Sequence, residues 1–129
     1  MAPTKSTRPR SVHLSVSDSF KVFVLDQLQD LSEVIARPMF GGVGLYHRGT
    51  FFGLLARDTL YLKVGDANRA DYEHAGMKPF KPYPNRSATM KYYAVPVDVL
   101  ESVPELLVWA RKAIAVAGVE APRKEWRDK

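Results

Sequence analysis

Hydrophobic positions in the first third of the chain recur at helical spacing. Large apolar side chains stand three or four positions apart at Phe20, Phe23, Val24, Leu28 and Leu31. This spacing is typical of one face of an amphipathic helix, and polar residues fill most of the opposite face. Ser17 is a suitable N-cap for such a helix. The pattern therefore predicts a helix that begins after Ser17 and packs one face on a core.

Strand patterns follow this helix. The apolar run from Val34 to Phe40 contains Pro38, which cannot donate to a ladder, so a short, bulged or edge strand is predicted there. Three further strands are predicted at 43–47, 50–56 and 59–64, with Arg48-Gly49 and Arg57-Asp58 as the turns between them. Because the connections are so short, we expect antiparallel pairing in a meander.

The second half of the chain mixes short helices with one more strand. Asp66 predicts the cap of a short helix at 67–75, which Gly76 would end. A proline-rich loop or extended edge (78–86), a strand (89–95), a helical turn (98–101) and a final helix that stops at Gly118 are predicted after it. This order predicts an α+β, two-layer domain at 15–118, in which helices flank an antiparallel meander. A disordered basic tail (1–14) and a polar tail (119–129) would flank the domain.

Composition limits the classes of protein that the chain can belong to. Its 129 residues are enough for one domain, and it contains no cysteine, which excludes disulfides and thiol chemistry. No apolar run is long enough to span a membrane. The net charge of +5 comes mostly from the two tails, so the folded part is nearly neutral. We expect a cytoplasmic protein.

Catalytic and metal-binding patterns do not emerge from the sequence. The glycine cluster Gly41-Gly42-Val43-Gly44 lacks the spacing of a phosphate-binding loop and precedes a strand pattern, which favours a turn or bulge before a hairpin. The histidines are not spaced as zinc ligands, and no nucleophile motif occurs. We therefore expect no enzymatic activity, no metal and no cofactor.

One basic segment is a candidate nucleic-acid contact. It contains Lys78, Lys81, Arg86 and Lys91, with aromatic residues between them and no acidic residue. Basic groups can neutralise phosphates, and aromatic faces can stack on bases. The alternative is that the segment is a loop packed on its own aromatic side chains, with one of Tyr92 and Tyr93 in the core.

The segment Arg37 to Tyr46 (RPMFGGVGLY) and the later Leu60-Tyr61-Leu62-Lys63 resemble the signature of the TfoX/Sxy family N-terminal domain. Phe52 to Leu55, Lys91 to Pro96 and the late apolar helix also fit, so that the resemblance covers roughly residues 16–117. The motif positions are Arg37, Met39, Phe40, Gly41, Gly42, Gly44, Tyr46 and Lys63. Most of them are expected to be structural, and Arg37 and Lys63 are the charged exceptions.

The resemblance implies a fold of the secretion-chaperone-like kind and a bacterial regulator of competence for DNA transformation. Members of this family act as transcriptional coactivators, and the longer ones carry a second, helical domain that this sequence does not extend to. We therefore expect a non-enzymatic module that acts through a protein partner, such as a transcription factor. A homo-oligomer formed through a strand edge is a further expectation. The alternative function is direct nucleic-acid binding through the tails and the Lys78–Lys91 segment.

Overall fold

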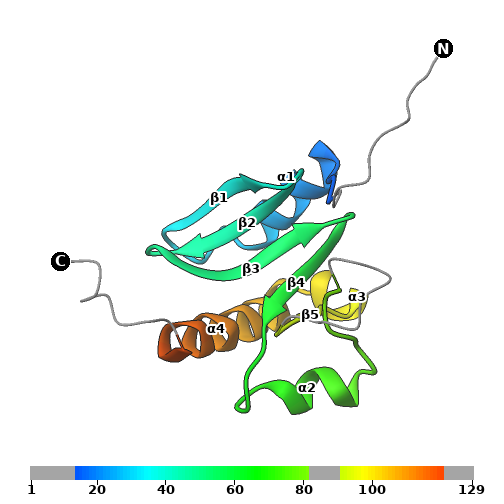
Figure 1. The fold of residues 1–129 in the computed structure, drawn as a ribbon, viewed down its shortest axis with the longest axis vertical. Coiled ribbons are helices and arrows are strands. Elements are labelled where there is room, and N and C mark those ends of the chain that lie inside the picture. Colours follow the sequence, from blue (N-terminus) through cyan, green and yellow to red (C-terminus); the bar gives the residue numbers. More distant parts are fainter. Residues whose placement is uncertain (1–13, 82–90, 121–129) are drawn as a thin grey trace.

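The computed structural model describes residues 14–81 and 91–120, and these form a single antiparallel sheet with helices (Figure 1). The elements in chain order are α1 (Asp18–Gln27), β1 (Val34–Met39), β2 (Gly42–His47), β3 (Thr50–Ala56), β4 (Thr59–Lys63), α2 (Arg69–His74), β5 (Tyr92–Ala94), α3 (Val97–Leu100) and α4 (Val103–Glu120). The five strands pair in sequence order, each antiparallel to the next. The prediction of an α+β fold with a meander is confirmed.

Tight turns between the first four strands produce the meander. Each turn has two central residues with positive φ: Phe40 and Gly41, Arg48 and Gly49, Arg57 and Asp58. Turns of this hand match the right-handed twist of the flanking strands. The predicted hairpin turns are confirmed, and the glycine cluster supplies the first of them.

Strand β1 forms one edge of the sheet, as Pro38 predicts. It pairs with β2 alone, in a register that sets Arg37 opposite Gly44 and Pro38 opposite Val43. At an edge, a proline without an N–H removes no hydrogen bond from a central ladder.

Helix α1 begins where the sequence predicts. The Ser17 hydroxyl accepts a hydrogen bond from the Phe20 N–H at 3.2 Å, which caps the helix, while the Ser17 N–H donates to Asp58 at 2.7 Å. Val24 and Leu28 are buried against the sheet. Phe23, which the spacing also assigns to the apolar face, is 39% exposed at the edge of that face.

Helix α4 packs across β3 and β4 (Figure 1). Ala110 and Ala113 are fully buried, and these small side chains let the helix approach the sheet closely. The predicted stop at Gly118 is wrong, since the helix continues to Glu120 and includes two residues assigned to the tail. Glycine lowers helix propensity by about 1 kcal/mol but does not forbid helical geometry, so the helix continues through it.

The connection from β4 to α2 differs from the prediction. Asp66 does not cap α2 but forms an ion pair with Arg69 at 2.9 Å, and Asn68 occupies the N-cap position. Asp66 lies two residues before the N-cap position, because α2 starts at Arg69 rather than at residue 67. Gly76, with φ of 73°, follows the C-cap Ala75 as predicted. The predicted tail at 1–14 is wrong at its last residue, since Leu14 is buried and its N–H donates to the Phe40 carbonyl. The rest of that tail (1–13), residues 82–90 with Arg86, and 121–129 lie outside the described residues.

Candidate functional site

The two faces of the sheet have different environments. The main core lies between one face and the helices, and it includes Val24 of α1, Tyr72 of α2, Val99 of α3 and Leu106 of α4. The other face carries a smaller buried cluster made of Leu14, Leu54, Ala56, Phe80 and Tyr92. None of the described helices contributes a residue to this second cluster. We call this second face of the sheet the open face.

The charged motif residue Arg37 lies on the open face, above an aromatic ring. Its guanidinium carbon is 5.8 Å from the centroid of the Tyr46 ring, and the Arg37 side chain is exposed. A cation above a ring face at this distance interacts favourably with the ring quadrupole. The motif therefore places a cation and its aromatic partner on adjacent strands.

Gly44 provides the space for the aromatic rings beside Arg37. A Cβ atom at this position would lie 3.2 Å from ring carbons of both Phe51 and Tyr46, and 3.5 Å from the Met39 sulfur. Such contacts are tighter than side chains normally make, so even alanine would push the rings apart. The role of Gly44 and Met39 in the motif is thus to seat these rings.

Aromatic rings cross the open face in a continuous line, which we call the aromatic row: Tyr46, Phe51 and Tyr92. The ring centroids of Tyr46 and Phe51 are 5.2 Å apart, and those of Phe51 and Tyr92 are also 5.2 Å apart. Both pairs are tilted, within the range of favourable aromatic contacts. The Lys63 ammonium nitrogen lies 5.2 Å from the Tyr92 centroid. The two charged motif residues, Arg37 and Lys63, therefore sit at opposite ends of the aromatic row.

A buried asparagine that sequence reasoning missed fixes the end of the strand that carries Lys63. Asn68 is 1% exposed; its Oδ1 accepts from the Gly65 N–H at 2.8 Å, and its Nδ2 donates to the Lys63 carbonyl at 3.0 Å. Asparagine commonly satisfies turn backbone in this way. The Gly-Asp-Ala-Asn sequence after β4 is the signal that could have indicated it.

The first residues of the predicted basic segment, 78–81, are described and lie beside β5. The Phe80 N–H donates to the Tyr92 carbonyl at 2.7 Å, and the Ala94 N–H donates to the Lys78 carbonyl at 3.2 Å. This pairing adds residues 78–80 to the sheet beyond β5 and buries Phe80 against Tyr61. Lys78, Lys81 and Lys91 are exposed. Tyr92 lies on the open face as part of the aromatic row, whereas Tyr93 packs on the helical side against Tyr72.

The remaining motif residues have structural roles at the first turn. Phe40 and Gly41 form it, and the Phe40 carbonyl accepts from the Leu14 N–H at 3.2 Å. A Cβ atom on Gly42 would lie 2.5 Å from the Leu55 carbonyl oxygen, so only glycine fits between these chains. Phe40 itself is 76% exposed, which no core function explains.

Two side chains on the helical side have shifted pKa values. Burial raises the pKa of the Tyr72 phenol, and its hydroxyl has no hydrogen-bond partner among the described residues. The hydrogen bond that Arg69 donates to the Asp66 carboxylate raises the pKa of Arg69. Neither group points to acid–base chemistry at neutral pH, because each shift holds the group in its ordinary protonation state.

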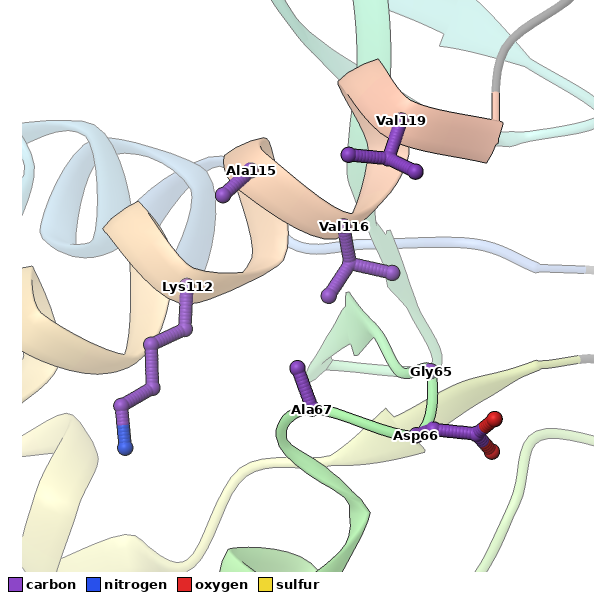
Figure 2. Close-up of a pocket in the computed structure, with 7 residues that line it drawn as sticks. All are labelled: Gly65, Asp66, Ala67, Lys112, Ala115, Val116 and Val119. Atoms are coloured by element: carbon purple, nitrogen blue, oxygen red, sulfur yellow. The ribbon is translucent and has the colours of Figure 1, made fainter.

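An apolar groove lies between the start of α2 and the last turns of α4 (Figure 2). Its volume is about 450 Å³, and it is lined by Gly65, Asp66, Ala67, Lys112, Ala115, Val116 and Val119. The methyl groups of Ala67 and Val116 point toward each other across it (Figure 2). Lys112, at one end, donates to Asp71 at 2.9 Å. We call this feature the α2–α4 groove.

A second, more polar cavity lies near the end of β2. It measures about 310 Å³ and is lined by Asp30, Leu31, Ser32, His47, Arg111 and Ile114. Both cavities lie away from the Arg37 and Lys63 side chains, which line neither of them. Within residues 14–81 and 91–120 there is no group of three or more potential metal ligands. In the same ranges, no helix combines the length and the apolar character needed to cross a membrane.

The domain is thus a sheet with helices on one face and cation–aromatic contacts on the other. Comparison with known proteins gives the family: the chain belongs to the TfoX N-terminal domain family, which it matches over residues 26–117. It is also 34% identical over 73 residues to the DNA transformation protein TfoX1 of Aliivibrio fischeri (strain ATCC 700601 / ES114). That match covers 56% of this chain but only 34% of the relative, so the chain corresponds to about a third of that protein.

Proposed function

We propose that this chain is a regulatory module of DNA transformation that has no catalytic activity of its own. It acts in the cytoplasm through a protein partner in transcription control. Membership of the TfoX N-terminal domain family carries the proposal, together with the similarity to a protein named for DNA transformation. The structure supports it with a surface suited to a partner rather than to a reaction.

The α2–α4 groove is the surface that best fits a protein partner. Val119 is 84% exposed at its rim, and Ala67, Ala115 and Val116 line it with apolar carbon. Exposed apolar surface rimmed by charged groups is typical of protein interaction sites. The hollow is large enough for one or two apolar side chains of a docked segment.

The charge around the groove favours a basic partner. The helices and their connections at 17–33, 65–77 and 97–120 contain many more acidic than basic residues. Beside the groove, the Asp66 side chain is 97% exposed. Opposite charges steer association and select partners. We therefore expect a partner segment that presents an apolar side chain flanked by lysine or arginine.

Crosslinking in the native cells, followed by affinity capture of the tagged full-length chain and mass spectrometry, tests this proposal. Val119→Gln removes exposed apolar surface from the groove rim. Val108→Gln is the matched control, because Val108 is 49% exposed on the same helix but does not line the groove. We expect a transcription regulator whose recovery falls about 5-fold or more with Val119→Gln.

The control variant should retain capture of the same regulator at the level of the unmodified chain. Recovery of no regulator by the unmodified chain would refute the proposal. Equal recovery by both variants would show that the groove is not the docking surface. Circular dichroism of both variants confirms that their helix content is unchanged.

A further inference from the structure

Charge is strongly segregated between the two layers of the domain. None of the five strands contains an acidic residue. In the range 34–63 and the segments 78–81 and 91–94, the one acidic residue is Asp58, and the basic residues are Arg37, Arg48, Arg57, Lys63, Lys78, Lys81 and Lys91. Asp58 lies in a turn, where it accepts from the Ser17 N–H. Arg48 is ion-paired with Glu33, which directly precedes β1. With this pair set aside, the sheet layer is still basic, although the described residues together are close to neutral.

The positions of these cations match a polyanion that also carries aromatic groups. Arg37 and Lys63 lie over the two ends of the aromatic row, on β1 and β4. Neighbouring strands are about 4.8 Å apart, so β1 and β4, which carry Arg37 and Lys63, are roughly 14 Å from each other. Four-stranded sheets that bind single-stranded nucleic acid stack two or three bases on rings across a comparable width.

We propose that the open face binds single-stranded nucleic acid. Arg37 and Lys63 contact phosphates, and bases stack on Tyr46 and on the guanidinium plane of Arg37. Lys78, which pairs with Ala94 at the neighbouring edge, extends the basic track. Duplex bases are already stacked on one another and are not free to stack on Tyr46 or Arg37, so the site favours a single strand over a duplex.

An acidic peptide is the competing ligand for a basic surface. Its carboxylates would pair with Arg37 and Lys63, but most of its side chains have no π-face for the aromatic row. The part-exposed Tyr46 ring beside Arg37 thus favours nucleic acid, while the buried Tyr92 ring supports the row from below. This site is independent of the proposed protein-partner groove, because the groove is formed by the β4–α2 connection and α4 on the helical side.

The test measures binding of the full-length chain to fluorescent oligothymidine of about 15 nucleotides, a length that spans one binding site. Anisotropy is recorded over a range of salt concentrations for the variants Arg37→Gln, Lys63→Gln and Tyr46→Leu. We expect each lysine or arginine variant to weaken binding about 3- to 10-fold and to reduce the salt slope by about 1. Tyr46→Leu should weaken binding about 10-fold with the salt slope unchanged.

Two matched variants on the helical side control for general charge effects. Arg111→Gln removes an exposed arginine, as Arg37→Gln does, and Lys21→Gln removes a partly buried lysine, as Lys63→Gln does. Both should bind oligothymidine like the unmodified chain. Because the basic tails are present in every variant, binding through the tails alone would leave Arg37→Gln unaffected and would overturn the proposal.

Two competitors complete the design. Duplex DNA of the same length should compete less well than unlabelled oligothymidine. Polyglutamate that competes as well as oligothymidine would overturn the proposal and identify the open face as an acidic-peptide surface. Equal competition by duplex and single strand, with Tyr46→Leu unaffected, would also overturn it, because base stacking would then contribute nothing. Thermal unfolding of each variant shows that the fold is retained.

Discussion

Tyr72 buries a phenol that makes no hydrogen bond to the described residues, although it packs well. Its ring lies 4.6 Å from the Trp109 ring in an edge-on arrangement and 5.7 Å from that of Tyr93. The ring is therefore stabilising, whereas the buried hydroxyl has a desolvation cost. We predict that Tyr72→Phe raises the free energy of unfolding by up to about 1 kcal/mol, measured by urea denaturation at pH 7.

The raised pKa of Tyr72 also predicts a pH dependence. Above pH of about 10 the unfolded chain loses this proton while the folded chain keeps it, so stability falls as the pH rises. Tyr72→Phe should flatten this alkaline loss. A variant whose stability decreases between pH 9 and 11 as steeply as that of the unmodified chain would contradict the assignment.

Asn68 is the second residue whose role depends on burial. Asn68→Ala removes the acceptor of the buried Gly65 N–H and the donor of the part-buried hydrogen bond to the Lys63 carbonyl. We predict a loss of about 2–4 kcal/mol, since each unsatisfied buried group costs about 1–3 kcal/mol. Urea denaturation measures the change. Asp66→Ala is the control, because its ion pair with Arg69 is exposed and should leave the midpoint unchanged.

The motif residues could be chosen from sequence, but their arrangement could not. Arg37 and Lys63 stood out as charges that a core does not require, yet only strand register brings them to one face with Tyr46. Tyr72 gave no comparable signal, and Asn68 gave only the turn-forming sequence Gly-Asp-Ala-Asn. Tyr72 looks like any other aromatic residue in a short helix, and the buried state of Asn68 depends on contacts made by distant elements.

At the scale of elements, the first hairpin depends on close backbone packing. Gly42→Ala places a Cβ atom 2.5 Å from the Leu55 carbonyl oxygen and 3.0 Å from Leu14. Because backbone must move to relieve this contact, we predict destabilisation of about 1–3 kcal/mol, measured by thermal or urea unfolding. Gly118→Ala is the matched control. Nothing lies within 4 Å of its added Cβ, and it should stabilise α4 by at most about 1 kcal/mol. Equal effects of the two substitutions would contradict this account of Gly42.

Local signals determined which elements were predicted correctly. The turns at Arg48-Gly49 and Arg57-Asp58 separate patterned strands, and the structure places positive φ at all four residues. The errors concern element ends, where tertiary context decides. Helix α4 continues past Gly118. Helix α2 begins later than Asp66 indicates, because Asn68 is the N-cap residue and its side chain donates to the Lys63 carbonyl at the end of β4.

At the scale of the whole molecule, net charge conceals how charge is distributed. From the sequence, the folded part was predicted to be nearly neutral, and this made its surface look unsuited to a polyanion. The structure separates the charges into a basic sheet layer and an acidic helical layer. The acidic residues lie mostly in the helices and their connections, which occur before, between and after the strands in the chain. The charges separate because all the described helices pack on one face of the sheet. Without that topology, the charge on the open face could not be predicted from the sequence.

Because the two surfaces lie on opposite layers, we predict that their functions can be removed separately. Val119→Gln should reduce capture of the protein partner while leaving oligothymidine affinity within about 2-fold, since the groove and the aromatic row share no residue. Arg37→Gln should have the reverse effect. The double variant should lose both, each by the same factor as in the corresponding single variant, as expected for distant sites. The measurements are the affinity capture and the anisotropy titration described above, made on the same protein preparations. Loss of both activities in either single variant would mean that the two layers form one binding surface, because a separate basic face and acidic face cannot both depend on one side chain.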